Sequence, residues 1–444
     1  MVGLALGLAI SASPALAQGL NPEESNKVKL LEPVSYTHLH HYLQGAEGKN
    51  ATRGLVYLIM HLIEDPIKMW GKEELKYWLA LDLCNGCGLR ASRMLKLYDR
   101  FETMKSFWHG SPSELKEMSR APYYLGWITD ELIAKFVAKR SEIDPDSLPD
   151  KLEQANVRAY PLAHPLYPHT LREIHDPPFV LYVKGEMSME SLVYGIGVVG
   201  TRTPSHYGQK LAKEFGRELA QAGVTVISGM AVGVDSFAHY GAIEAGGKTA
   251  AVLACGPDIC YPSSNKPLFA KLAEDPKGLV LSEYFPGTTP EKWRFPARNR
   301  IISGIGQGLL VIEAGKGSGS LITARQAFEQ DRQVFSIPGR IDQPTSEGTN
   351  RLIADNMAQL VTSVPEIMKA LNWATSTRPR TEPIVLELFG REKDVHELLS
   401  NEPVHFDQLT EKTGMTAGEL SSTLTMLELA GLAERLPGDW YVRG

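Results

Sequence analysis

Short runs of β-branched and aliphatic residues, separated by stretches with helical periodicity, restrict the fold of this chain more than any other feature of its sequence. The runs lie at residues 196–199, 224–227, 249–253, 279–281, 309–312, 334–337 and 359–361. Nearly continuous apolar strands that alternate with helices are typical of a parallel sheet covered on both faces. We therefore predict an α/β fold with a Rossmann-like parallel sheet, and a binding site where ligands bind such sheets, at the carboxyl ends of the strands.

The length of 444 residues predicts about three domains, because domains average roughly 150 residues. Before the sheet region, helical spacing interrupted at Asn85-Gly86-Cys87-Gly88 indicates helices joined by a tight turn. Such a turn could present amides to a DNA phosphate, and a plain helical packing module is the alternative. The expected parts are an irregular segment at 1–70, a helical SAM-like or helix-hairpin-helix-like domain at 71–145, the Rossmann-like domain at 155–372 and a winged helix at 384–444.

The amino terminus has two interpretations. Residues 2–12 are apolar and Ala15-Leu16-Ala17 resembles a signal-peptidase site, but no Lys or Arg precedes them. Alternatively, residues 33–39 match a translated transposon end used in sequencing libraries, which would make residues 1–40 a chimeric assembly artefact. No later stretch reaches about 18 uninterrupted apolar residues, so we expect no transmembrane helix and no membrane partner.

The cysteines do not form a convincing metal site. Cys84 and Cys87 are spaced as C-x-x-C, but Cys255 and Cys260 follow about 170 residues later, and no histidine pair completes a ligand set. Cys255 ends an apolar run, which favours a buried thiol at the end of a strand. We expect neither a metal nor a disulfide.

Three predicted strands are followed by glycine- and serine-rich loops that open into helices. Small residues let backbone N–H groups approach an anion, and a helix amino terminus favours negative charge, so each loop could hold a phosphate. The candidate residues are Gly200, Thr201 and Arg202 in the first loop, Ser228, Gly229, Gly233 and Asp235 in the second, and Ser318, Gly319 and Ser320 in the third.

Nucleotide cofactors are not expected at these loops. Residues 195–200 match G-x-G-x-x-G as a string, but these glycines lie inside the strand, and no acidic residue follows at the distance needed for a ribose. The loop from Gly315 to Ser320 is not a Walker A motif, because Lys316 precedes the serines. We therefore predict no cofactor and no nucleotide triphosphate hydrolysis.

Residues 292–300, Lys-Trp-Arg-Phe-Pro-Ala-Arg-Asn-Arg, combine four cations with two aromatic rings and no acid. Single-stranded DNA binding needs this combination, because cations hold phosphates while bases stack on rings. The net charge of −6 means that any such contact must be local. The alternative is that Trp293 and Phe295 are core residues, and that Arg298 and Arg300 pair with carboxylates. Candidate carboxylates are Glu283 and Glu313.

Catalytic groups are weakly represented. Asp235 and His239 could form an acid–base pair one helical turn apart, but an Asp at a helix start is ordinarily an N-cap. Glu313 could polarise a water, although a strand-end carboxylate more often pairs with an arginine. We expect no enzyme activity.

A set of motifs in a fixed order carries a resemblance to a known family. The motifs are Val199-Gly-Thr-Arg202, residues 228–235 with Ala238-His239, Ala254-Cys-Gly256 followed by Tyr261-Pro262, Ser282-Glu283, residues 295–302, residues 318–324 and Ile337-Pro-Gly339. Together they span about 200 residues and resemble the DNA-processing protein A family, also called DprA or Smf. Asp355-Asn-Met-Ala358 departs from the Gly-Ala expected there, which leaves the last turn of the domain and the dimer surface near it open.

The resemblance implies a cytoplasmic homodimer that coats incoming single-stranded DNA in natural transformation, protects it and helps to load RecA recombinase. It also implies that Arg202 clamps a phosphate, and that Lys248 and the Arg298, Asn299 and Arg300 strip extend the phosphate track. One rival is a phosphoribohydrolase-like enzyme of the same superfamily, for which Glu313 and the loop at 315–320 are a loose match. The other is a transcription factor that reads duplex DNA, although the would-be recognition helix has Glu419 and Glu428 and no Lys or Arg.

Overall fold

The computed structural model describes residues 66–84, 93–94, 103–117, 125–373, 390–400 and 402–443. The predicted glycine turn at 85–88 and the two interpretations of residues 1–40 lie outside the described residues. Within the described part, no helix is both long and apolar enough to cross a membrane.

Helices precede the sheet, as predicted. They are α5 (Pro66–Leu83), α7 (Met104–His109), α8 (Pro112–Glu117), α9 (Asp130–Arg140) and α10 (Leu148–Gln154). Thr103 and Thr129 cap α7 and α9, because their side chains accept backbone N–H groups of the first turn. The rings of Phe107 and Phe136 stack at 5.2 Å between centroids and hold α7 against α9.

The core is a nine-stranded sheet with the order β1-β2-β6-β5-β4-β3-β7-β8-β9. The strands are β1 (Arg158–Pro161), β2 (Val180–Lys184), β3 (Gly195–Val199), β4 (Thr225–Ser228), β5 (Thr249–Leu253), β6 (Gly278–Ser282), β7 (Gly308–Val311), β8 (Gln333–Ser336) and β9 (Gln359–Leu360). The Rossmann-like parallel sheet is thus confirmed from β3 onward, since these strands pair in parallel. The prediction missed β1 and β2, of which β2 pairs antiparallel with β6.

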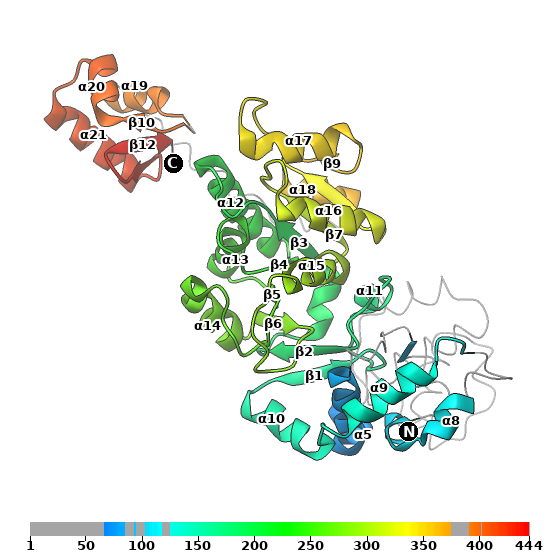
Figure 1. The fold of residues 1–444 in the computed structure, drawn as a ribbon. Coiled ribbons are helices and arrows are strands. Elements are labelled where there is room, and N and C mark those ends of the chain that lie inside the picture. Colours follow the sequence, from blue (N-terminus) through cyan, green and yellow to red (C-terminus); the bar gives the residue numbers. More distant parts are fainter. Residues whose placement is uncertain are drawn as a thin grey trace, which may run out of the picture. The chain divides into compact units, whose positions relative to one another are not determined.

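Helices cover both faces of this sheet (Figure 1). One layer contains α12 (His206–Gln221), α13 (Val234–Glu244) and α18 (Val364–Ala370), which pack on Ile196 and Val198. The opposite face carries α15 (Arg294–Ile305) and α16 (Gly319–Glu329). Gly197, between Ile196 and Val198, faces this second layer, because a Cβ there would meet the Ile302 carbonyl oxygen at 3.2 Å.

The order of the strands places a topological switch point beside β3. From β3 the chain proceeds to β4, β5 and β6 on one side, then returns to form β7 on the other side of β3. The loops that leave β3 and β7 therefore diverge at the carboxyl edge of the sheet and open a crevice there.

The carboxyl-terminal part is a winged helix, as predicted. It consists of α19 (Arg391–Leu398), β10 (Val404–His405), α20 (Phe406–Thr413), α21 (Ala417–Leu429), β11 (Ala433–Leu436) and β12 (Trp440–Arg443). A separate apolar cluster built on Leu409, Leu420 and Leu424 holds its helices together. Gly414 ends α20 with a left-handed φ of 65°, which glycine adopts without steric cost.

Candidate nucleic-acid interface

A cavity of about 620 Å³ opens at the carboxyl edge of the sheet, at the switch point. Loops after β3, β4 and β7 and the first turns of α15 and α16 form its walls. The predicted residues that line it are Gly200, Arg202, Asp235, Arg298, Asn299, Ser318, Gly319 and Ser320. Gly229 lines a smaller adjoining cavity of about 70 Å³, which shares Arg202 and Phe295 with the large one.

Three other predicted residues, Thr201, Ser228 and Gly233, lie outside the cavity wall and fix the conformation of the first two loops. The Thr201 amide donates to the Glu313 carbonyl oxygen at 2.7 Å, and the buried Ser228 hydroxyl donates to the Val198 carbonyl at 2.6 Å. Gly233 has a φ of 89°, and a Cβ there would lie 2.5 Å from the Thr201 carbonyl oxygen. These residues hold the first two loops together and do not line the cavity.

The amino terminus of α12 is occupied by a carboxylate of the protein itself. Glu313, buried at the end of β7, accepts from the Ser205 amide at 2.9 Å, the Ser205 hydroxyl at 2.7 Å and the Thr345 hydroxyl at 2.9 Å. Glu313 therefore neither pairs with an arginine, as we had favoured, nor is free to polarise a water. It fills the position where the first loop was predicted to hold a phosphate at the helix terminus.

The second loop is filled in the same way. One oxygen of Asp235 accepts from the amides of Gly229 and Ala231 at 3.1 and 3.3 Å. Burial raises the pKa of this carboxyl, while the nearby Arg298 opposes the shift. Asp235 is not the N-cap of α13, which is Gly233. The amides that were predicted to bind phosphate thus already bind a side chain.

Arg298 lies in the interior rather than on an exposed strip. Its guanidinium donates to the Gly229 carbonyl at 2.8 Å and to the Val252 carbonyl, and the residue is 5% exposed. Burial lowers its pKa to about 10. Arg298 therefore joins the ends of β4 and β5 and supplies positive charge beside Asp235, at the floor of the cavity.

Two further predicted cations lie away from the cavity. Arg300 forms an ion pair with Glu283, with one contact at 2.9 Å, which is the pairing that we had named as an alternative. Lys248 directly precedes β5, at the amino-terminal edge of the sheet, and donates to the Ser191 hydroxyl at 2.8 Å. Neither side chain lines the cavity.

The third loop is the one that stays open. Ser318 caps α16, its hydroxyl lies 2.8 Å from that of Ser320, and Gly319 and Lys316 are exposed. Among the described residues, no carboxylate is bonded to this helix terminus and none pairs with Lys316. The α16 terminus can therefore accept an anion from solution.

The cationic and aromatic residues of 292–300 do not all face the same side, because residues 294–300 form the start of α15. Lys292, Phe295 and Asn299 face the cavity at helical spacing. The Phe295 ring lies 5.4 Å from the ring of Tyr261 and 5.8 Å from the Arg202 guanidinium. Neither Arg202 nor Lys292 forms an ion pair within the described part of the chain, and both line the cavity.

Sequence reasoning missed Tyr261 as a site residue, although it belonged to a quoted motif. It lines both cavities and is 42% exposed. Only the fold brings it next to Phe295, more than thirty residues along the chain. An exposed aromatic side chain in a loop after a predicted strand was the available signal.

The possible Asp235–His239 pair does not form. Nδ1 of His239 bonds the Thr249 hydroxyl at 2.7 Å, and complete burial lowers the pKa of this histidine to about 3. His239 is therefore neutral at pH 7 and lies in the packed interior between α13 and β5. It has no access to the cavity.

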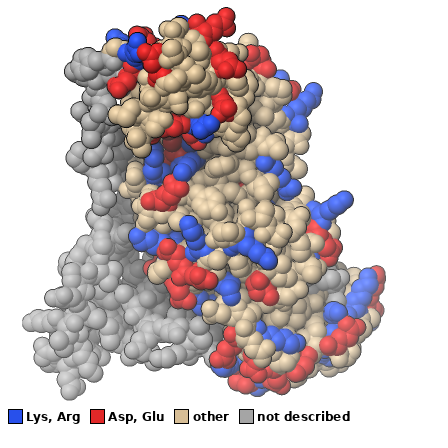
Figure 2. All heavy atoms as spheres, turned by 90° about the vertical axis from the view of Figure 1, so that its left-hand side faces the viewer, with Lys and Arg blue, Asp and Glu red and all other residues tan. Residues whose placement is uncertain are grey.

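Charge over the wider surface is mixed. Figure 2 shows one face on which blue and red side chains are interspersed, in agreement with the net charge of −6. Attraction for a polyanion must therefore come from local groups such as those at the cavity.

Two family models and several known proteins match this chain. The model of the family described as DNA recombination-mediator protein A matches residues 159–372, and that of the DprA winged helix domain matches residues 381–439. A Synechocystis protein named Smf is 32% identical over 83% of this chain and 99% of its own length. A Bacillus subtilis DNA processing protein DprA is 37% identical over 60% of this chain and 88% of its own. The X-ray structure of DNA processing protein A from Streptococcus pneumoniae superposes with a TM-score of 0.51 and 34% identity, over 63% of this chain and 97% of that one.

Proposed function

This chain belongs to the DNA recombination-mediator protein A family, and from that premise we propose that it binds single-stranded DNA without sequence preference. The observation that carries the proposal is the cavity at the switch point. It combines cations that form no ion pair within the described residues, two aromatic rings that line the cavity, and an open helix terminus. Cations and a helix terminus bind phosphates, and aromatic rings stack on bases of any kind, so these elements recognise groups that all nucleotides have.

Phosphates and bases have separate places in the cavity. Arg202, Lys292 and the α16 terminus supply positive charge for the backbone, while Tyr261 and Phe295 offer faces on which a base can stack. Stacking on an aromatic ring tolerates any base, because every base has a π-face. A cavity of about 620 Å³ receives a splayed nucleotide, whereas a stacked base pair in a duplex cannot present its faces to these rings.

The protein acts as a binding protein and not as an enzyme. Asp235, which lines the cavity, and Glu313, which follows β7, are both bonded to amides or hydroxyls of the protein. This bonding argues against the phosphoribohydrolase-like alternative, which needs a carboxylate free to act on substrate or water. Release of free base from a nucleoside monophosphate by the purified protein would revive that alternative.

We also propose the cellular role that the family resemblance implies. The chain protects incoming single strands and helps to load RecA recombinase in transformation and recombination, as a cytoplasmic homodimer built on the Rossmann-like domain. The division at residues 155–372 and 384–444 separates this DNA-binding domain from the winged helix, and residues 71–145 form the helical accessory domain. The matched spans of the family models, 159–372 and 381–439, support the division between the Rossmann-like domain and the winged helix.

Fluorescence anisotropy with a mixed-sequence single strand and its duplex, across a salt series, tests the binding proposal. The wild type should prefer the single strand, and each phosphate contact should add about −0.7 to the slope of log K against log salt. Arg202→Ala should weaken binding and reduce that slope by about 0.7. Lys248→Ala is the matched control, because this lysine lies at the opposite edge of the sheet, and it should bind like the wild type.

Equal binding of duplex and single strand, or wild-type affinity in Arg202→Ala, would refute the proposal. A loss of affinity in Lys248→Ala comparable with that in Arg202→Ala would place the DNA elsewhere.

A further inference from the structure

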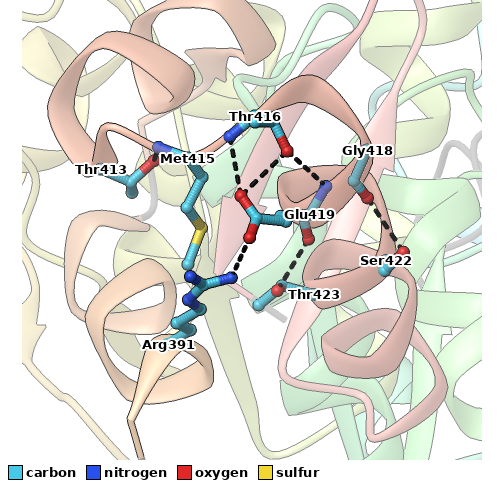
Figure 3. A network of polar contacts seen from close by, with 8 residues as sticks. All are labelled: Arg391, Thr413, Met415, Thr416, Gly418, Glu419, Ser422 and Thr423. Atoms are coloured by element: carbon cyan, nitrogen blue, oxygen red, sulfur yellow. Dashed lines mark hydrogen bonds and ion pairs between the residues drawn. The ribbon is translucent and has the colours of Figure 1, made fainter.

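Helix α21 presents a face without charge to solvent. Its two carboxylates are turned toward the winged helix itself: Glu419 bonds Thr416 and Arg391 at the start of the helix (Figure 3), and Glu428 is partly buried. A recognition helix that reads a major groove needs donors and cations at these positions. This one has neither a Lys nor an Arg.

Two hydroxyl groups of the exposed face, those of Ser422 and Thr425, bond within the helix. Ser422 donates to the Gly418 carbonyl at 2.9 Å and Thr425 to the Ser421 carbonyl at 2.9 Å, so their donors are used by the helix. A Cβ added at Gly418 would meet nothing within 4 Å. The face is therefore smooth and open along the first half of the helix.

The second half of the same face is apolar. Met426 is 56% exposed and Leu429 is 79% exposed. Met426 and Leu429 lie four and seven residues beyond Ser422, at spacings that keep them on one side of a helix. Together, Gly418, Ser421, Ser422, Thr425, Met426 and Leu429 form a stripe that we call the α21 face.

The charge around this face indicates what it binds. Residues 390–443 contain ten Asp and Glu residues against five Lys and Arg. At the top of Figure 2, the side of this domain that carries α20 and α21 shows uncharged surface bordered mainly by acidic side chains. In the wing, Arg435 pairs with Asp439, and Arg443 donates to the His396 carbonyl of the same domain. Both DNA and a second copy of this acidic domain would be repelled.

We infer that the α21 face docks an amphipathic helix of a partner protein whose apolar side is flanked by Lys and Arg. Small residues at Gly418 and Ser422 let the partner's helix approach to the 8–10 Å between axes at which helices pack. Met426 and Leu429 are the apolar anchors, and the acidic border attracts the flanking cations. The inference is independent of the DNA site, since none of its residues lines the cavity.

The test uses the full chain and a defined probe. The probe is a fluorescein-labelled 18-residue helical peptide with Leu on one side and Lys on the other, and its affinity is measured by anisotropy. The same peptide with Glu in place of Lys is the comparison. We expect the Lys peptide to bind and the Glu peptide not to bind, and we expect binding to weaken as salt rises.

Leu429→Ala and Met426→Ala should each lower the affinity for the Lys peptide by about tenfold, because each removes an apolar anchor of the interface. Ile341→Ala is the matched control, because this aliphatic side chain is 99% exposed on the Rossmann-like domain, and it should not change the affinity. All three side chains are exposed, so the variants should fold. Single-stranded DNA binding should remain at the wild-type level in each variant, which separates a failure of this inference from a failure of the DNA proposal.

Absence of peptide binding, or equal binding by wild type and Leu429→Ala, would overturn the inference. Duplex binding that Leu429→Ala abolishes would make the α21 face a DNA reader instead. Concentration-dependent self-association that the same substitution abolishes would make it an interface between copies.

Discussion

Replacing Arg298 by methionine separates the two roles that can be given to this residue. As a phosphate ligand, Arg298 would matter for DNA affinity and little for stability. In the structure it is buried, and its guanidinium holds the carbonyls of Gly229 and Val252 beside the Asp235 carboxylate. Methionine preserves much of the side-chain volume but removes both donors and the positive charge.

The expected loss of stability is large. A hydrogen bond to a charged group contributes about 1.5–3 kcal/mol, and removing one partner of a buried charged cluster costs about 3–5 kcal/mol. We therefore expect Arg298→Met to lower the free energy of unfolding of the α/β domain by about 3–5 kcal/mol, a large share of the 5–15 kcal/mol typical of folded domains. Arg202→Ala, on an exposed loop, should change it by less than about 0.5 kcal/mol.

Pulse proteolysis across a urea series measures this effect, with the surviving core fragment identified by mass so that the helical and winged-helix domains do not contribute. Adding Asp235→Asn to Arg298→Met should restore about 1–2 kcal/mol, because it removes the carboxylate left without a cation. If Arg298→Met unfolds at the wild-type urea concentration but no longer binds a single strand, the structural role argued here is refuted.

Two further predictions concern His239 and Lys316. The unfolded chain binds more protons than the folded one between the lowered pKa of His239, about 3, and its ordinary value of 6.5, so stability falls as the pH falls through this range. Between pH 7 and pH 5 the wild type should lose about 2 kcal/mol more than His239→Gln in urea unfolding, and parallel losses would show that the histidine is accessible to protons when folded. Lys316→Ala should reduce the salt slope of single-strand binding by about 0.7 without a change in urea midpoint, and an unchanged slope would remove the α16 terminus from the proposed interface.

The local pattern of the sequence determined the architecture. Apolar runs indicate buried strands reliably, because both faces of a strand in a covered parallel sheet are removed from water. The predicted strands correspond to β3 to β9. Glycine-rich loops after β3, β4 and β7 could also be placed correctly, since parallel strands bring their carboxyl ends to one edge. The strands β1 and β2 were missed because they precede the alternating pattern, and β2 pairs antiparallel.

Which groups of these loops remain free was decided by the tertiary structure alone. Glu313 fills the terminus of α12 from a strand more than a hundred residues away, and Asp235 turns back onto the amides of its own loop. Residues 292–300 read as one basic strip, but in α15 Arg298 is buried at the floor of the cavity and Arg300 pairs with Glu283, while Lys292, which precedes the helix, lines the cavity. The sequence by itself determined the chemical groups at the edge of the sheet, because the loops that follow parallel strands all lie at the carboxyl edge, whatever the order of the strands. Their partners depend on contacts between distant segments, and only the packed structure determines those.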